Sequence, residues 1–203
     1  MHRFFVSTSD LEEDEIVLPD EVRRHLAVLR AKADEEILLL DGTGTLCRCR
    51  LEARGKSVTH ARTLVRWREE ETAFPVHLLQ SLPKGEKMEL ILQKGTELGM
   101  AAFTPILTAR SIPSRGKNRQ ENRQQRWNRI MREAARQCRR PVLPRLVSPQ
   151  PLAEALATCG DALRLVLWEE ESHPLAEVLP AQPPRSAAIL VGPEGGLDPA
   201  DVA

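Results

Sequence analysis

The spacing of apolar residues changes part-way along the chain. In the first 70 residues, short apolar and alternating runs predict a small module rich in strands, at residues 36–41, 46–51 and 58–67, with a hairpin turn at 41–44. A stripe of Val22, Leu26 and Leu29 predicts a short helix that starts near Pro19. The acidic run 69–71, followed by Pro75, marks the end of this module.

From Pro75 onward, strands alternate with helices. Apolar runs predict strands at 76–82, 101–107, 163–168 and 187–191, and 3.6-residue periodicity predicts helices at 86–98, from 118 to before Pro141, and at 152–157. Within the helix predicted at 86–98, Met88, Ile91, Leu92 and Leu98 are expected to face inward. This alternation is typical of an α/β fold with a mostly parallel sheet.

The helix expected from residue 118 carries the strongest charge signal. Its apolar residues have the spacing of one buried face: Trp127, Ile130, Met131, Ala134, Ala135 and Cys138. Five arginines are predicted on the opposite face: Arg129, Arg132, Arg136, Arg139 and Arg140. The whole chain has a net charge of zero, yet residues 110–145 contain 12 basic and 2 acidic residues. Because charges of one sign repel each other, this stripe favours contact with nucleic acid over an ordinary solvated helix face.

The last predicted strand leads into the turn Gly192-Pro193-Glu194-Gly195-Gly196. A glycine turn at the carboxyl end of an α/β sheet is a common ligand site, although glycine and proline also make plain tight connections. The turn lacks the Lys-Ser/Thr of a P-loop, and its carboxylate would repel a phosphate. A neutral or cationic ligand, such as adenosine joined to an amino acid, fits better. Trp168 and Glu169 end the neighbouring strand and either wall the same cleft or belong to an exposed loop.

Other classes of chemistry find little support. The four cysteines are irregularly spaced, so no metal site is predicted and reduced thiols in a cytoplasmic protein are expected. The histidines show no triad or metal spacing, and no Gly-x-Ser-x-Gly motif occurs. No apolar run approaches the length of a membrane span.

Several separated motifs are familiar in combination. They are RFF at 3–5, HLAVLR at 25–30, KGEKM at 84–88, QKGTELG at 93–99, EAARQC at 133–138 and GPEGG at 192–196. Together they resemble the bacterial small-subunit ribosomal RNA methyltransferase E family, whose members methylate N3 of a uridine in 16S ribosomal RNA with S-adenosyl-L-methionine. The resemblance implies a PUA-like RNA-binding β-barrel over residues 1–72 and a SPOUT-type α/β methyltransferase domain over 73–203. It also implies a C-terminal trefoil knot, incomplete here, and a homodimer.

The resemblance assigns roles to individual residues. The cofactor loops would be Leu167, Trp168 and Glu169, together with Gly192, Pro193, Glu194, Gly195 and Gly196. The front domain would bring Arg3, His25 and Arg30 to the RNA. The substrate side of the second domain would be lined by Lys84, Lys87, Lys94, Glu97, Arg110, Arg136 and Arg140. Arg110 and Lys94 are candidate catalytic cations that would stabilise a uridine anion, and no catalytic base is assigned.

One departure from the family concerns the end of the sequence. Family members continue past residue 203 with a strand and a Leu-Gly-x-Arg-x-Leu-Arg-x-Glu-Thr-Ala loop and helix, which complete the knot and the cofactor pocket. We therefore expect the chain as printed to bind the cofactor poorly and to be inactive. The alternative function is a non-catalytic RNA-binding protein with a vestigial methyltransferase domain.

Overall fold

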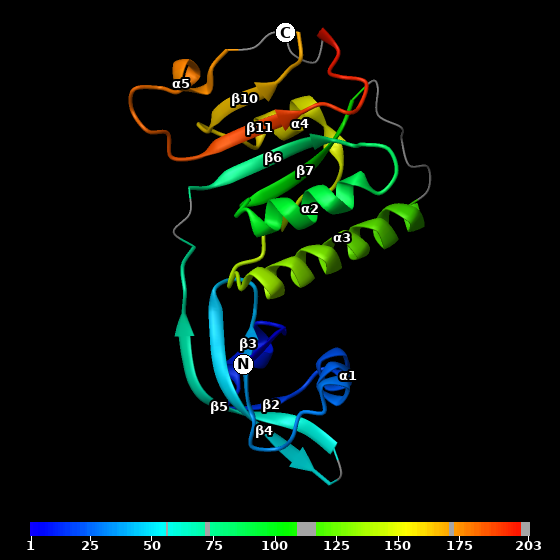
Figure 1. The fold of residues 1–203 in the computed structure, drawn as a ribbon, viewed down its shortest axis with the longest axis vertical. Coiled ribbons are helices and arrows are strands. Elements are labelled where there is room, and N and C mark those ends of the chain that lie inside the picture. The colour runs from blue at the N-terminus through cyan, green and yellow to red at the C-terminus, as the bar shows by residue number, and fades with distance from the viewer. Residues whose placement is uncertain (56, 72–73, 109–116, 171–172, 200–203) are drawn as a thin grey trace. The chain divides into compact units, whose positions relative to one another are not determined.

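The structure is a computed structural model that describes residues 1–203 except 56, 72–73, 109–116, 171–172 and 200–203. The chain divides into two compact units (Figure 1). Unit 1 contains residues 1–72 together with 135–143, and unit 2 contains residues 73–134 and 144–203.

Unit 1 is built on a five-stranded sheet with the strand order β1-β3-β4-β5-β2. The strands are β1 (His2–Phe5), β2 (Glu15–Val17), β3 (Glu36–Leu40), β4 (Thr45–Arg54) and β5 (Ser57–Arg68). β1 pairs with β3 in parallel, and the other pairs are antiparallel. Asp41 fixes the predicted hairpin turn, because its carboxylate Oδ1 accepts hydrogen bonds from the backbone N–H groups of Thr43 (2.7 Å) and Thr45 (3.1 Å). The sheet is the PUA-like module that the resemblance implied.

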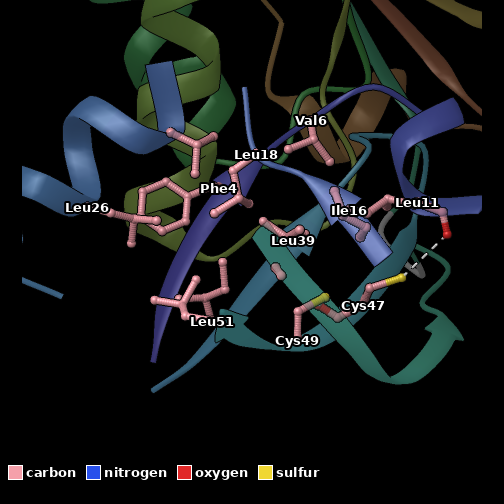
Figure 2. Close-up of a cluster of buried hydrophobic side chains, with 13 residues drawn as sticks. Phe4, Val6, Leu11, Ile16, Leu18, Leu26, Leu39, Cys47, Cys49 and Leu51 are labelled. Atoms are coloured by element: carbon pink, nitrogen blue, oxygen red, sulfur yellow. Dashed lines mark hydrogen bonds between the residues drawn. The ribbon is translucent and has the colours of Figure 1, made fainter. Parts of the chain in front are cut away.

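The core of unit 1 lies between this sheet, the 3₁₀ helix η1 (Ser9–Glu12) and the helix α1 (Asp20–Leu29) (Figure 2). Alternation along β4 places Cys47, Cys49 and Leu51 on the buried face. Burial raises the pKa of the Cys49 thiol to about 11, so this cysteine is an inert core residue. The apolar stripe of α1 is shorter than predicted, because Val22 and Leu26 are buried but Leu29 is exposed at the last helical residue.

Unit 2 contains a six-stranded parallel sheet with the order β10-β11-β6-β7-β8, and β9 also pairs with β7. The strands are β6 (Val76–Ser81), β7 (Ala102–Leu107), β8 (Arg145–Leu146), β9 (Gln150–Pro151), β10 (Leu163–Leu167) and β11 (Ala187–Val191). The helices are α2 (Lys87–Glu97), α3 (Lys117–Cys138), α4 (Leu152–Ala157) and α5 (Leu175–Val178). The parallel sheet and the positions of α2, α3, α4 and β11 confirm the expected α/β fold.

Two apolar clusters lie on opposite faces of this sheet. Leu78 and Phe103 pack on the face that also buries Leu92 of α2 and Trp127 of α3. The other face packs against α4 and contains Leu79, Ile106, Ala155, Leu190 and Leu197. Gly95 lets α2 approach the sheet closely, since a Cβ added there would lie 2.6 Å from the ring of Phe103. This packing fixes the direction of α2, which begins at the carboxyl edge of the sheet and runs toward the amino edge.

Two helix ends differ from the sequence-based expectation. Leu98, expected to face inward, is 79% exposed because α2 ends one residue before it. Helix α3 ends at Cys138, which is exposed instead of buried, and Arg139 adopts a left-handed conformation with φ 66°. Of the helices in the described part of the chain, none combines the length and the apolar character that a membrane crossing requires.

Candidate functional site

Both predicted cofactor loops lie at the carboxyl edge of the unit 2 sheet. The strand registers align Leu167 with Val191, and Val191 with Gln80. Trp168 and Gly192, the next residues along β10 and β11, therefore leave the sheet beside Ser81, the last residue of β6. The structure thus brings residues 167–169 and 192–196 together, at the ends of strands whose paired residues are 24 positions apart in sequence.

Gly196 allows the two loops to touch. It has φ 73°, and a Cβ built on it would collide with the Glu169 carboxylate. Gly192 is held from the neighbouring strand, because Gln80 Nε2 donates to the carbonyl oxygens of Gly192 (3.3 Å) and Ser81 (3.0 Å). The glycine turn is therefore a defined piece of backbone packed against Glu169 and Gln80.

Three buried polar side-chain atoms at this edge have no hydrogen-bond partner among the residues that the structure describes. They are Trp168 Nε1, Ser81 Oγ and Gln150 Nε2. Gln150 belongs to the same edge because β9 pairs Gln150 with Ile106, at the end of β7. Buried polar groups in folded proteins are normally hydrogen-bonded. Three unsatisfied atoms along the edge that holds the glycine turn fit a polar ligand that offers hydrogen-bond acceptors.

Glu194 ties the glycine turn to the loop between β6 and α2. Its carboxylate accepts hydrogen bonds from Lys87 Nζ (2.6 Å) and from the backbone N–H of Lys84 (3.2 Å). The hydrogen bond from Lys87, helped by the backbone N–H groups, lowers the pKa of Glu194 to about 2. A carboxylate that stays ionised in this way positions backbone and is a poor proton acceptor. Lys87, predicted to contact RNA, already has a carboxylate partner.

One of the two candidate catalytic cations, Lys94, lies away from this edge. Lys94 lies seven residues after Lys87 on α2, about 10 Å further along the helix and away from the carboxyl edge. Its Nζ pairs with Glu97 Oε2 at 2.8 Å, and this hydrogen bond lowers the pKa of Glu97. The structure does not bring Lys94 to the glycine turn of the same chain. Arg110 lies outside the described residues.

The predicted arginine stripe is only partly correct. Arg129 and Arg132 are exposed on α3. Arg139 is exposed too, but it lies beyond the helix end. Arg140 was predicted on the exposed face and is instead buried, with a side chain only 9% exposed and Nε 2.5 Å from Glu71 Oε1. The left-handed turn at Arg139 ends the helical periodicity and redirects Arg140 into unit 1.

Three residues that the resemblance placed on the RNA side come together in unit 1. Arg136 Nη1 lies 3.1 Å from His25 Nδ1, and the His25 ring packs edge-on against Phe4. Arg3 Nη1 donates to the carbonyl oxygen of Arg139 at 2.9 Å.

Arg30 is exposed at the end of α1, where it borders a cleft of about 790 Å³ between α1 and β5. Arg23 and Arg24 line the same cleft. The sequence analysis missed these two arginines, although they lie one helical turn before the predicted motif residue Ala27.

Comparison with known proteins shows which family the chain belongs to. A family model described as an RNA methyltransferase domain matches residues 70–203, and one described as an RNA methyltransferase PUA domain matches residues 18–59. The ribosomal RNA small subunit methyltransferase E of Bacillus subtilis (strain 168) is 30% identical, over 100% of this chain and 84% of the relative. The chain belongs to the ribosomal RNA small subunit methyltransferase E family.

Two further members support this assignment. The methyltransferase E of Mycobacterium tuberculosis (strain CDC 1551 / Oshkosh) is 35% identical, over 98% of this chain and 78% of the relative. The crystal structure of the methyltransferase E from Neisseria gonorrhoeae, bound to S-adenosyl methionine, has a TM-score of 0.86 and 29% identity, covering 100% of this chain and 84% of that one. These findings confirm the resemblance to the methyltransferase E family.

Within the described residues, no group of three or more His, Cys, Asp or Glu side chains is placed to hold a metal ion. Ser81 and Gln150, which sequence reasoning missed, carry no motif of their own. Only the pairing of β6, β7, β9 and β11 reveals that they lie on the same sheet edge as the glycine turn.

Proposed function

We propose that this chain, as a member of the methyltransferase E family, methylates N3 of a uridine in 16S ribosomal RNA with S-adenosyl-L-methionine. One observation carries the proposal: the unsatisfied buried polar atoms of Trp168 and Ser81 flank a glycine turn at the carboxyl edge of a parallel sheet, and that of Gln150 lies further along the same edge. The gonococcal relative, whose fold matches with a TM-score of 0.86, is described as bound to S-adenosyl methionine.

The proposed cofactor site consists of the two loops at this edge. Its residues are Leu167, Trp168 and Glu169 with Gly192, Pro193, Glu194, Gly195 and Gly196, and we add Ser81 and Gln150. The residues fit the cofactor, since the Trp168 and Gln150 N–H groups lack acceptors and the glycine turn presents backbone without side chains. The cofactor supplies an activated methyl group on a sulfonium. Glu194 contributes indirectly by fixing the turn against Lys84 and Lys87.

The residues proposed to contact RNA come from both predicted domains, 1–72 and 73–203. The members in unit 1 are Arg3, His25, Arg30, Arg136 and Arg139, and those in unit 2 are Lys84, Lys87, Arg129 and Arg132. Arg129 and Arg132 are exposed cations on one helix, which suits backbone phosphates. Arg140 is left out, because its guanidinium is paired with Glu71 inside unit 1.

Methylation of N3 sets demands on the chain. The uridine must be unpaired before its N3 can face a methyl donor, and positioning then supplies much of the acceleration. A nearby cation stabilises the uridine anion as the N3 proton leaves. Lys94 and Arg110 stay the candidates for that cation. Because Lys94 lies away from the glycine turn of its own chain, it would have to act at a different site.

We further propose a homodimer, for which the exposed leucines Leu90 and Leu98 on or beside α2 offer apolar surface. The trefoil knot and the cytoplasmic location stay predictions. The sequence-based expectation of poor cofactor binding and inactivity is the opposite of the outcome proposed here, and the assay below separates the two.

The test is incubation of the chain with small ribosomal subunits and methyl-labelled cofactor, followed by nuclease digestion and mass spectrometry of the nucleosides. We expect label in N3-methyluridine, and none with a Gly196→Val variant. Label in another nucleoside would overturn the N3 assignment. RNA binding with no methyl transfer would favour the non-catalytic RNA-binding protein.

A further inference from the structure

A second cleft lies in unit 2. It has a volume of about 350 Å³ and is formed by the β6–α2 loop with the first turn of α2 on one side and α3 on the other. Its lining includes Pro83, Gly85, Asn122, Arg123 and Trp127. None of its lining residues belongs to the proposed cofactor site or to the predicted RNA surface. The cleft is within the size range of small-ligand pockets.

Arg123 is the unusual residue of this cleft. Its guanidinium carbon lies 4.9 Å from the centroid of the Trp127 ring, and Trp127 is only 3% exposed. The Nε atom of Arg123 is buried and has no hydrogen-bond partner, and no ion pair joins Arg123 to any residue that the structure describes. Partial burial lowers the pKa of this guanidinium. A desolvated cation without an anion is costly, so the arrangement calls for an external anion.

The neighbouring cation differs in this respect. Arg126 Nη2 lies 3.1 Å from Glu86 Oε1 and 2.8 Å from Glu89 Oε2, so two carboxylates compensate its charge. These are also the carboxylates that line the cleft. The four charged side chains of the lining sum to zero, but Arg126 engages both carboxylates, so Arg123 is the cation of the cleft that has no direct ionic contact among the described residues. The Asn122 amide adds a neutral donor to the wall.

We infer that Arg123, seated on Trp127, binds a backbone phosphate of the RNA substrate in this cleft. The inference rests on the proposed function, which makes RNA the substrate. Arginine suits the role because its planar guanidinium donates two parallel hydrogen bonds to a phosphate while its face stacks on an aromatic ring. The cleft then fixes one phosphate of the strand beside the β6–α2 loop, which Glu194 connects to the glycine turn.

The experiment measures the affinity of a single-stranded oligoribonucleotide for the full chain at several salt concentrations. The variants are Arg123→Gln, Arg123→Lys and the control Arg164→Gln, which removes an exposed arginine on β10. We expect Arg123→Gln to weaken binding about tenfold, as loss of one charged hydrogen-bonding partner does. The slope of log K against log salt should fall by about 0.7, the value for one phosphate on a single strand. Arg123→Lys should keep the slope, because the charge remains, and weaken binding less.

A purely structural role for Arg123 on Trp127 would lower the thermal unfolding midpoint and leave the slope unchanged, and this result would overturn the inference. It would also be overturned if inorganic phosphate, at matched ionic strength, shifted the Trp127 indole resonance while Arg123→Gln left RNA affinity intact. If the unmodified chain bound no RNA, the proposed function itself would fail, which is a distinct outcome.

Discussion

The carboxylate of Glu194 lies 2.6 Å from the ammonium of Lys87 and fastens the glycine turn to the start of α2. Its pKa of about 2, below the ordinary 4.5, means that the folded state holds the ionised form more tightly than the unfolded chain does. The stabilisation is complete above the unfolded pKa and is lost as the pH falls through the folded value. A carboxyl NMR titration should place the Glu194 midpoint near 2. A midpoint near 4.5 would contradict the contact.

The contact between Gly196 and Glu169 predicts that a methyl group added at residue 196 weakens cofactor binding selectively. Gly196→Ala places a Cβ where the Glu169 carboxylate lies, in a backbone conformation with φ 73°. Gly160→Ala is the matched control, because Gly160 also has a positive φ (53°) but has no atom within 4 Å of the added Cβ. Both variants should lose roughly 1–2 kcal/mol of unfolding free energy from the left-handed backbone. Only Gly196→Ala should weaken cofactor binding in calorimetry, and equal weakening by both would refute the contact.

The burial of Arg140 predicts that it stabilises unit 1 and does not contact RNA. Arg140→Met leaves the Glu71 carboxylate without this guanidinium, in a partly buried position. We expect a loss of about 2 kcal/mol in unfolding free energy, less than for a fully buried pair because Glu71 remains partly exposed. Arg132→Gln, on the exposed surface of α3, should change stability by less than about 0.5 kcal/mol. Urea denaturation of both variants checks this, and an unaffected Arg140→Met would show the pair to be unimportant.

Arg129 and Arg132 provide the test of the exposed stripe on α3. Replacing both with Gln should weaken binding of a ribosomal RNA fragment and lower the magnitude of the salt slope by about 1–2. Arg136 is left intact because it contacts His25 within unit 1. An unchanged salt slope would show that this surface is an ordinary solvated helix face.

Much of the fold follows from apolar periodicity. The parallel sheet of unit 2 and the bounds of α4 and β11 match the predicted segments, because buried strands and helices of this kind have strong local patterns. The errors lie at helix ends. Periodicity alone extends α3 through Arg140, whereas the left-handed residue Arg139 ends the helix and turns Arg140 inward.

The site was predictable where it forms a local motif. The glycine turn and the Trp168-Glu169 loop are readable in the sequence, and the structure brings them together. Ser81, Gln150 and Arg123 were not predictable in this way, since their significance depends on strand register and on missing partners. The local spacing of residues encodes neither the strand register nor the absence of a hydrogen-bond partner.

The most direct test of the central claim observes the indole N–H resonances of the three tryptophans while S-adenosyl-L-methionine is added. Trp168 Nε1 lacks a partner at the proposed cofactor edge, whereas Trp67 Nε1 already donates to Glu69 Oε1 at 2.9 Å in unit 1. The Trp168 resonance, assigned by its disappearance in Trp168→Phe, should move saturably while that of Trp67 stays in place. If saturating cofactor shifted the Trp67 resonance alone, or shifted no indole resonance at all, that result would contradict the account.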